Sequence, residues 1–472
     1  MTSMSVNPVA ERYLYPEDFA GPEVHSTSDA AKGFFKVGDD LVCYGRCSFV
    51  SPSSCLGGNL PDVLGVMTAN RQSPTFPFDP GEVVDNLRRE RYVSAAHSDD
   101  LSSGFMQACR GLYYRLRPFM PLSLRARVKK AYIAGWEKKT FPRWPVDRTA
   151  DLLLERLLEL SLKAQQKTDI AFIWFWPDGF ESSAIMTHDV ETSAGLDFLN
   201  TVMEMDESVG IRASVQLVPE ERYVVTETLL CEIRSRGFEV NVHDLNHDGR
   251  LFDNRQEFLS RAKKINAYAR GFGAKGYRSG AMYRNSDWYD AFEFEYDMSV
   301  PNVAHLDPQH GGCCTVMPYF IGDILELPLT TVQDYFLFYV LHHNSIDLWK
   351  QQIEMIRSQH GMMSFIVHPD YVIDAQHRAW FKTLLEHLQV LRGDGTVWFA
   401  LPGEVNQWWR QRSKMRLKRK GSGWSIEGEG SERALIAYAY LQDGKLAYRI
   451  DPPPAALPSA SAQRQVQAVN CT

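Results

Sequence analysis

The sequence predicts an α/β protein whose main part is built from repeated β/α units around a parallel sheet. Two observations carry this prediction. Between about residues 169 and 412, short apolar runs of strand length alternate with amphipathic segments of helical length. Clusters of Asp, His and Arg stand where successive predicted strands end, which is the face that carries catalytic groups in parallel β/α folds. A closed or nearly closed barrel is the architecture that such a repeat favours.

The elements of this barrel follow from the apolar periodicity of each segment. Strands are expected where four to six apolar or β-branched residues run together, and helices where apolar residues recur every three or four positions. The expected strands are 184–187, 213–218, 238–243, 296–300, 364–368 and 397–401. The expected helices are 192–206, 221–236, 255–270, 346–360, 376–391 and 404–412.

Residues 1–150 form an accessory region to which the sequence assigns no fold beyond irregular α+β. It contains a strand-like run at 40–50 and a basic helical stretch at 122–139. It ends at 141–147, FPRWPVD, where two prolines and an N-capping Asp147 precede an apolar-periodic helix. Leucines 152, 153, 157 and 160 form the apolar face of that helix. A domain boundary is expected here, ahead of a barrel at 165–412.

Residues 413–472 are expected to be a basic linker, a small β appendage and a disordered tail. The linker is the run SKMRLKRKGSG at 413–423, and strands are expected at 424–427, 434–441 and 445–450. Asp443 and Gly444 form a hairpin-turn signal between the last two strands. The tail after Asp451 is rich in Pro, Ala, Ser and Gln, a composition typical of disorder.

Composition excludes several classes of function. A net charge of -7 provides no basic field for nucleic-acid phosphates, so no nucleic-acid partner is expected. The longest strongly apolar run, 335–341, is far shorter than the roughly 20 residues that a membrane span requires. The N-terminal residues lack the pattern of a secretory signal, and eight scattered cysteines fit free thiols in a reducing compartment. We therefore expect a cytoplasmic protein in which Cys43, Cys47 and Cys55 are structural.

Two polar clusters follow the first predicted strands. In Thr187-His188-Asp189-Val190-Glu191, the two carboxylates are two residues apart, so an extended backbone directs both to one side. In the second cluster, His243 and His247 are four residues apart, and on one turn of helix they would grip a single ion. The zinc-protease motif HExxH is the competing interpretation. It is disfavoured because Asp replaces Glu and because Asp248-Gly249 would end the helix at once.

Two further clusters complete the set. Arg278 lies in the turn Tyr277-Arg278-Ser279-Gly280, and His368 ends the apolar run Phe365-Ile366-Val367 ahead of a proline. Taken alone, each of these residues is more often a surface cation or a structural histidine than a functional group. Their order along the chain is the informative feature.

The ordered set resembles the polysaccharide deacetylases of the NodB-homology type, carbohydrate esterase family 4, over about residues 165–412. The YRSGAMYRN and ILELPLT segments also resemble the exopolysaccharide-associated branch. The resemblance implies a distorted (β/α) barrel that binds a divalent metal ion, with zinc favoured. It also implies an acetylated polysaccharide or oligosaccharide substrate and association with proteins of polysaccharide biosynthesis.

The resemblance assigns the metal-binding role to His243 and His247. The commonest form of the first motif has adjacent aspartates, of which the second binds metal, but Val190 occupies that position here. Variants of the family with DVD or DVE shift the ligand by one residue. The third metal ligand is therefore expected to be Glu191.

The resemblance also assigns the catalytic roles. Asp189 matches the base, Arg278 matches the arginine that orients it, and His368 matches the acid that protonates the leaving group. Asp297 is the carboxylate expected to assist His368. Exposed aromatic rings near these clusters are expected to stack on sugar rings; the alternative is that these rings pack in the core or rim of the barrel. The candidates are Trp174, Trp176, Tyr283, Trp288 and Trp398.

These residues predict a hydrolase that removes N- or O-linked acetyl groups from a glycan with metal-activated water. Two alternatives stay open. The first is a catalytically impaired barrel that binds glycans or organises a polysaccharide-biosynthesis complex, since Val190 and other motif positions depart from the family pattern. The second is a metal-dependent amidase or esterase that acts on a substrate other than a glycan.

Overall fold

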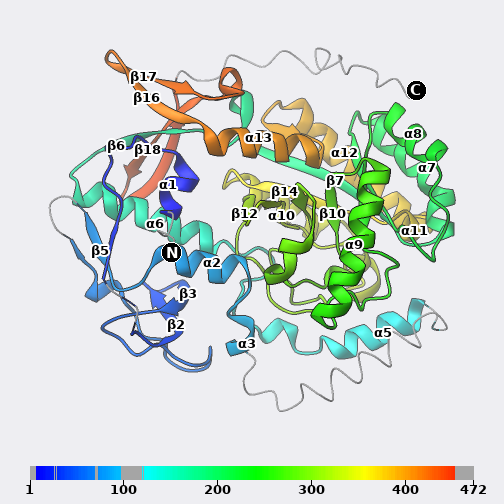
Figure 1. Ribbon diagram of the computed structural model, residues 1–472, viewed down its shortest axis with the longest axis horizontal. Coiled ribbons are helices and arrows are strands. Elements are labelled where there is room, and N and C mark those ends of the chain that lie inside the picture. The colour runs from blue at the N-terminus through cyan, green and yellow to red at the C-terminus, as the bar shows by residue number, and fades with distance from the viewer. Residues whose placement is uncertain are drawn as a thin grey trace.

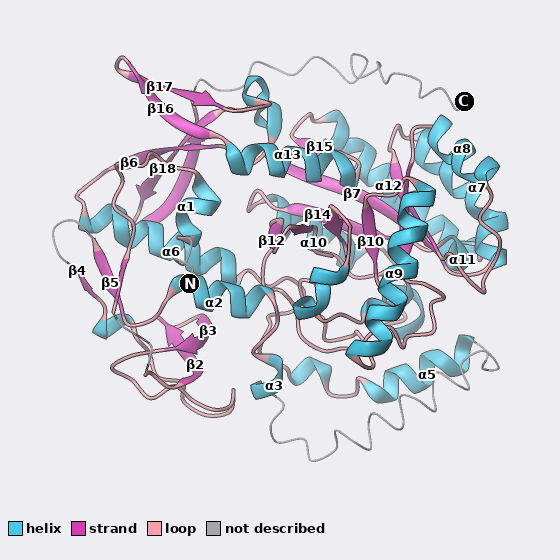
Figure 2. Ribbon diagram, in the orientation of Figure 1, coloured by secondary structure: helices cyan, strands magenta, loops and turns pink. Residues whose placement is uncertain are grey.

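The computed structural model describes residues 7–25, 27, 29–69, 73–96, 120 and 122–451 of the chain. Figure 1 shows a central sheet with helices packed around it on the right. The N-terminal elements and the C-terminal hairpins gather on the left of the same view (Figures 1 and 2). The predicted α/β class is therefore confirmed.

The central sheet has nine strands, eight of them in the order β12-β13-β11-β10-β9-β8-β7-β14, with β15 paired to the first part of β7. All neighbours run parallel except β12, which is antiparallel to β13. Among the described residues, no pairing joins β12 to β14. The sheet is therefore a curled half-barrel, whereas a closed or nearly closed barrel was expected. The strands are β7 (Ser182–Val190), β8 (Ala213–Leu217), β9 (Glu239–His243), β10 (Gly276–Arg278), β11 (Tyr296–Asp297), β12 (Tyr319–Ile321), β13 (Ile324–Glu326), β14 (Met362–Ile366) and β15 (Val397–Phe399).

Helices connect and cover these strands, and side chains cap most of them. The hydroxyl of Thr192 accepts a hydrogen bond from the Gly195 N–H at the start of α7, and Asn254 does the same for Glu257 at the start of α9. The α-helices here are α7 (Ser193–Ser208), α8 (Glu227–Ser235), α9 (Arg255–Phe272), α10 (Asp347–Arg357), α11 (Pro369–Val372), α12 (Ala375–Gly393) and α13 (Pro402–Lys414). Short turns of helix are η4 (Pro177–Gly179), η5 (Gly280–Met282), η6 (Ser286–Ala291) and the π-helical η7 (Phe336–Val340).

Alternation along the strands separates a polar interior from an apolar exterior. Ala184 and Met186 on β7 join the hydrophobic core that the covering helices complete, as do the alternate residues of β8 and β9. The intervening residues are mostly buried and polar, with the exception of Ile185, which belongs to the second core. On β7 the polar ones are Ser183, Thr187 and Asp189, which places Asp189 at the mouth of a polar interior.

The N-terminal region packs as a set of short elements against a second core. Its hydrophobic residues share that core with α6, with β6 and with α13. The predicted strand at 40–50 is observed as β3, and the helix predicted after Asp147 is observed as α6. The elements are α1 (Pro8–Tyr13), β1 (Glu23–Val24), β2 (Lys32–Val37), β3 (Leu41–Arg46), η1 (Leu64–Val66), β4 (Thr68–Ala69), β5 (Pro74–Phe76), α2 (Pro80–Arg88), α3 (Val93–Ala96), α5 (Leu122–Tyr132), η3 (Trp136–Lys138) and α6 (Thr149–Ala164).

The C-terminal segment is less separate than the sequence suggests. β6 (Asp169–Ile173) pairs with β18 (Ile436–Gln442), and β18 pairs with β19 (Lys445–Ile450), so a strand ahead of the barrel shares a sheet with the appendage. The turn between β18 and β19 is the expected Asp443-Gly444, both with positive φ. The basic run expected to be a linker instead forms most of a hairpin, in which β16 (Arg416–Lys420) pairs with β17 (Gly423–Glu427). One further helical turn is η8 (Ser431–Arg433). The tail expected to be disordered lies outside the described residues from position 452.

Two expected elements are shorter than predicted. The helix expected from residue 221 begins at Glu227, because Thr226 is in an extended conformation and caps it. The strand expected at 296–300 pairs only over Tyr296–Asp297. In the part of the chain that the structure describes, no helix has the length and apolarity that crossing a membrane would require.

Candidate metal centre

The six residues predicted as the site come together at one end of the half-barrel. Asp189 ends β7 with Glu191 just beyond it, His243 ends β9, Arg278 ends β10, and His368 follows β14. Parallel pairing puts these ends at one edge of the sheet, and Arg278 is the direct register partner of His243. His247 lies four residues past His243. All of these side chains are buried except that of Glu191, which is partly exposed.

A carboxylate and two imidazoles form a metal-binding geometry at this edge. One ligand atom each from Glu191, His243 and His247 lies within 4.8 Å of the other two. Nε2 of His247 is 2.9 Å from Oε1 of Glu191, and the two imidazole centroids are 4.8 Å apart. The three residues that the sequence assigned to a metal therefore do converge.

The backbone that brings the two histidines together is not the turn of helix that their spacing suggested. His243 is still part of β9, and the N–H of Asp244 donates to the carbonyl of Arg278 at 2.8 Å. Asp244 and His247 then both adopt positive φ, near 57° and 55°, in a tight loop. This loop, and not helical periodicity, turns the second imidazole back toward the first.

A glycine in the arginine turn makes room for this loop. A Cβ added at Gly280 would lie 2.4 Å from Oδ2 of Asp244 and 3.1 Å from Cδ2 of His247. Any larger residue there would displace one of these side chains. The glycine of the Arg278-Ser279-Gly280 turn is thus required by the position of His247.

The triad presents hydrogen-bond acceptors to one point. Nδ1 of His243 lies 3.2 Å from the Arg278 carbonyl, to which it donates, and this fixes Nε2 as the acceptor. Nε2 of His243 is buried with no hydrogen-bond partner, and Nε2 of His247 makes no hydrogen bond despite its approach to Glu191. Burial lowers the pKa of His243 to about 4, so this imidazole is neutral at pH 7. Two imidazole nitrogens and a carboxylate aimed at one space are the donor set of a zinc-type cation site.

Asp189 lies beside this triad as an ionised carboxylate. Its Oδ2 is 3.7 Å from Nη1 of Arg278 and 3.9 Å from Nε2 of His243, while its Oδ1 has no hydrogen-bond partner. Burial would raise the pKa of Asp189, but the charges of Arg278, His243 and His368 outweigh it and hold the pKa below its usual value. Arg278 is itself held by a hydrogen bond from Nη2 to Oγ1 of Thr187 at 3.0 Å.

His368 is paired with the carboxylate of Asp334, a residue that the sequence patterns did not identify. Asp334 Oδ1 lies 2.6 Å from Nδ1 of His368, and Asp334 Oδ2 accepts the backbone N–H of His368 at 2.7 Å. Nε2 of His368 points toward Glu191, with 3.7 Å to its Oε1. Burial lowers the pKa of His368, but Asp334, Glu191 and Asp189 outweigh it and raise the pKa to about 10. This histidine is charged at neutral pH.

Asp297 was expected to assist His368, but Asp334 takes that place and Asp297 accepts hydrogen bonds from other side chains. Its carboxylate accepts hydrogen bonds from the hydroxyls of Tyr289 at 2.8 Å and Ser299 at 2.5 Å. Asp334 begins the helical turn that continues into η7, a segment for which the sequence predicts neither strand nor helix, so nothing in the sequence placed it beside His368. The two oxygens of Asp334 together position both the ring and the backbone of the histidine.

A second carboxylate fixes the loop that bears Glu191. Oδ2 of Asp370 accepts the Glu191 N–H at 3.1 Å, and Asp370 also bonds the Thr192 hydroxyl. A Cβ at Gly195 would lie 2.2 Å from Oδ2 of Asp370, so only glycine fits there. This arrangement aims the Glu191 side chain at the two imidazoles.

The aromatic residues proposed to stack on sugars are mostly packed in the protein interior. Trp174, Trp176 and Trp398 belong to the second hydrophobic core. The indole N–H groups of Trp174 and Trp176 donate to the carbonyls of Phe180 and His360, each at 2.7 Å. Tyr283 is buried, and Trp288 packs against aromatic rings of the first core. The packing interpretation is the correct one for these side chains.

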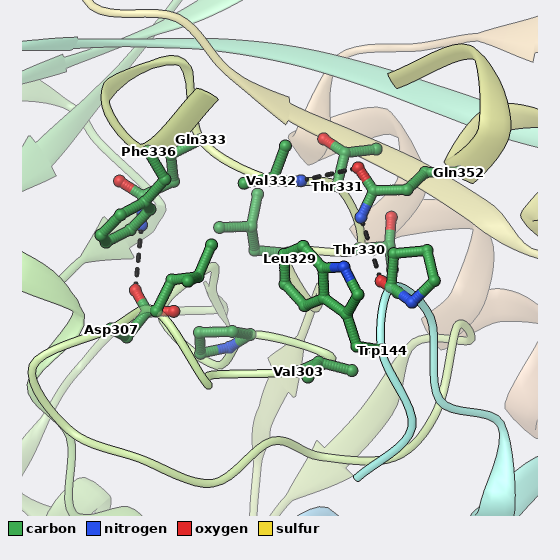
Figure 3. Close-up of a pocket in the computed structure, with 13 residues that line it drawn as sticks. Trp144, Val303, Asp307, Leu329, Thr330, Thr331, Val332, Gln333, Phe336 and Gln352 are labelled. Carbon is green, nitrogen blue, oxygen red and sulfur yellow. Dashed lines mark hydrogen bonds between the residues drawn. The ribbon is translucent and has the colours of Figure 1, made fainter. Parts of the chain in front are cut away.

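Figure 3 shows a small pocket whose lining includes Gln333, the neighbour of Asp334. Trp144, from the N-terminal region, forms one wall, and Leu329 and Phe336 lie on others. Gln333, the neighbour of Asp334, donates to Asp307 across the pocket at 3.2 Å. Gln352 closes another side through hydrogen bonds with Val332 and Pro145, both 3.0 Å long. The N-terminal region therefore reaches the elements that hold the site.

No family model and no curated protein match this chain. Among solved structures, it is similar to a protein of Mycobacterium smegmatis described as a polysaccharide deacetylase, with 15% identity over 50% of this chain and 93% of that one, at a TM-score of 0.41. It is also similar to the peptidoglycan deacetylase PdaC of Bacillus subtilis, with 10% identity over 49% and 93% and a TM-score of 0.32. A third is BA3943 of Bacillus anthracis, a carbohydrate esterase family 4 pseudoenzyme, with 14% identity over 48% and 65% and a TM-score of 0.31.

Similarity at this level assigns no activity to the chain, and the pseudoenzyme is one of the matches. These three solved structures match this chain over about half its length, and they are described as a polysaccharide deacetylase, a peptidoglycan deacetylase and a carbohydrate esterase family 4 pseudoenzyme.

Proposed function

We propose that this protein is a metal-dependent hydrolase that removes acetyl groups from an N- or O-acetylated glycan. One observation carries the proposal: an acceptor-only triad of Glu191, His243 and His247 stands between an ionised carboxylate and a protonated histidine. Such a constellation provides a cation site, a base and an acid within one buried edge. This is the set of groups that acyl hydrolysis at neutral pH requires.

The triad residues would hold the ion. A divalent cation bound there lowers the pKa of coordinated water toward about 7 and polarises an acyl carbonyl. The neutral state of His243 suits this role, because a protonated imidazole cannot donate a lone pair. Two imidazole nitrogens and one carboxylate would leave coordination positions on the ion for water and substrate, as a catalytic centre needs.

Asp189 is the base in this proposal. It stays ionised because Arg278 is 3.7 Å away, and its unpaired Oδ1 is available to accept a proton from the attacking water. Arg278 acts as a positioning residue, since its own anchor to Thr187 keeps the guanidinium in place. The base is therefore ready before substrate arrives, without any rearrangement.

His368 is the acid. Asp334 holds its Nδ1, so the proton on Nε2 faces the site and can pass to the departing nitrogen or oxygen of the sugar. The products are acetate and a free amine or hydroxyl. Acid and base lie at the ends of two neighbouring parallel strands, His368 just after β14 and Asp189 on β7, so that one can deliver a proton while the other accepts one.

Asp189→Asn tests the proposal. We expect kcat for acetate release from an acetylated glycan panel to fall by about 10²- to 10⁴-fold, with the bound metal content unchanged. Glu191→Gln is the matched comparison, because it should lose metal as well as activity. Retention of the parental rate by Asp189→Asn would show that the base is misassigned.

One observation favours a second candidate. Of the five aromatic rings expected to stack on sugars, four are buried and Trp288 is partly buried against the first core, so none of these candidates forms an open stacking platform. The same centre would then act on an amide or ester outside glycans. Acetate release from chitooligosaccharides against small acylated amides separates the two, because a glycan deacetylase prefers the former by its kcat/KM.

A further inference from the structure

The segment 122–139, which begins with helix α5, is basic, whereas the chain as a whole carries a net negative charge. Residues 122–139 contain six cationic side chains and one acidic one, within a protein of net charge -7. The acidic residue is Glu137. The cationic residues are Arg125, Arg127, Lys129, Lys130, Lys138 and Lys139. This segment, which the proposed hydrolytic centre does not use, is therefore strongly basic, as is the run at 413–423.

The same helix exposes apolar side chains along one face. Leu124, Val128 and Tyr132 are 44%, 39% and 44% exposed, and their spacing of four residues places them in a row. Arg127 is exposed at the edge of this row, and Lys130 is exposed on the far side of the helix. Exposed leucine, valine and tyrosine side chains in a line, accompanied by cations, form an amphipathic surface that faces water.

The opposite side of the segment is anchored to the body of the protein. Ile133, nine residues or two and a half turns from Leu124, is buried in the first core. Trp136 packs edge-on against Trp144 at 4.8 Å, and Trp144 is the wall of the pocket in Figure 3. Figure 1 shows α5, in cyan, along the lower edge of the molecule. Its apolar row is thus held outward by contacts on its other side.

The last residue of the apolar row is fixed in orientation. The hydroxyl of Tyr132 donates to the carbonyl of Pro308 at 3.1 Å, and its ring stacks on His310 with centroids 5.7 Å apart. The tyrosine keeps 44% of its surface exposed with these contacts made. An amphipathic ring held at a surface with a polar tip is the type of side chain found at lipid interfaces.

We propose that α5 docks this protein onto an anionic lipid surface. Arg127 at the edge of the row and Lys130 on the polar side of the helix attract acidic headgroups, while Leu124, Val128 and Tyr132 enter the boundary between headgroups and acyl chains. A polyanion such as nucleic acid would pair with the cations but leave the apolar row in water. Lipid is the partner that satisfies both features. This inference concerns attachment and does not depend on the reaction at the metal centre.

The test is sedimentation of the full chain with vesicles of phosphatidylcholine containing about a third phosphatidylglycerol, against vesicles of phosphatidylcholine alone. We expect binding to the anionic vesicles that weakens as salt rises, and little binding to the neutral ones. Arg127→Glu with Lys130→Glu should weaken partition at least about 25-fold, at about fivefold for each charge lost. Leu124→Ser with Val128→Ser should weaken it about tenfold.

Matched controls come from α12, where Val390 and Lys382 are also exposed. Val390→Ser and Lys382→Glu should bind vesicles like the parent. All variants should keep the parental melting temperature and the parental hydrolysis of a soluble substrate, so that a failure here is separable from a failure of the proposed function. The proposal is overturned if neutral vesicles bind equally well, if the α5 variants bind like the parent, or if the parent binds heparin with an affinity that exceeds its affinity for vesicles.

Discussion

Two histidines of the candidate centre, His243 on the β9 side and His368 on the β14 side, are equally buried but differ in charge. The pKa of His243 is lowered to about 4 and that of His368 is raised to about 10. The difference lies in the partner of Nδ1, which is a backbone carbonyl for His243 and the carboxylate of Asp334 for His368. Burial alone therefore does not decide protonation. In the proposed reaction, one kind of side chain serves as a metal ligand at the end of one strand and as an acid after another.

The largest expected effect distinguishes the two histidines by whether their replacement removes the bound metal as well as the activity. His243→Ala should lower metal affinity by more than about 100-fold and abolish activity, because it removes a ligand. His368→Ala should lower kcat by about 10²- to 10⁴-fold and keep the metal. Metal analysis and acetate release on the same samples check this. Loss of metal by His368→Ala would remove the distinction between the two sides.

The next effect tests whether Asp334 is what makes His368 an acid. Asp334→Asn keeps a side chain of the same shape but removes the negative charge, so kcat should fall on the order of 100-fold. The parent's raised pKa means that this ion pair stabilises the fold fully below about pH 6.5 and is lost as pH rises through about 10. In the variant, that alkaline loss of stability should move toward neutral pH. Urea unfolding between pH 6 and 10 measures it, and identical profiles would contradict the pairing.

A smaller effect is expected from the glycine that accommodates His247. Gly280→Ala should displace Asp244 or His247 and weaken metal binding about tenfold, because the new Cβ would lie 2.4 Å from Oδ2 of Asp244. Gly271→Ala on α9 is the control, since nothing lies within 4 Å of its Cβ. Isothermal titration with zinc compares the two. Equal affinities would show that the loop relaxes without disturbing the ligands.

The smallest effect concerns a like-charge pair elsewhere in the interior. Burial first, and then neighbouring Asp297, raise the pKa of Glu326 well above its usual value, so the folded protein holds a proton that the unfolded chain releases. Stability of the parent should therefore decline as pH rises above about 4.5. Glu326→Gln should remove this decline and gain roughly 1 kcal/mol at pH 8 relative to pH 5. Denaturant unfolding at both values decides, and a parallel decline in the variant would assign the effect to another group.

The strand-end clusters were predictable because alternation and β/α repetition both depend on local sequence. Asp189, His243, Arg278 and His368 all end or follow strands of one sheet, as the pattern indicated. The conformation between His243 and His247 was not predictable, since two positive φ angles in non-glycine residues are imposed by tertiary contacts. The roles of these residues in catalysis stay predictions.

Asp334 was missed because it lies in a short helical turn leading into η7, which has no sequence periodicity to locate it. For the tryptophans, sequence alone could not separate stacking from packing, because proximity in sequence to a motif does not reveal which face of an element a side chain occupies. The open edge of the half-barrel follows from the same kind of information. Whether β12 and β14 approach each other depends on the summed twist of the sheet, which no single segment encodes.

The sheet that joins β6 to β18 and β19 has a consequence for how the chain folds. Ile173 on β6 pairs with Ile436 on β18. During synthesis, β6 therefore cannot pair until β18, near the end of the described chain, has been made. Such non-local pairing delays folding because a very long loop must close first. Until then, the apolar residues of β6 and α6 lie in an unfinished core, and this edge is where a nascent or truncated chain would aggregate.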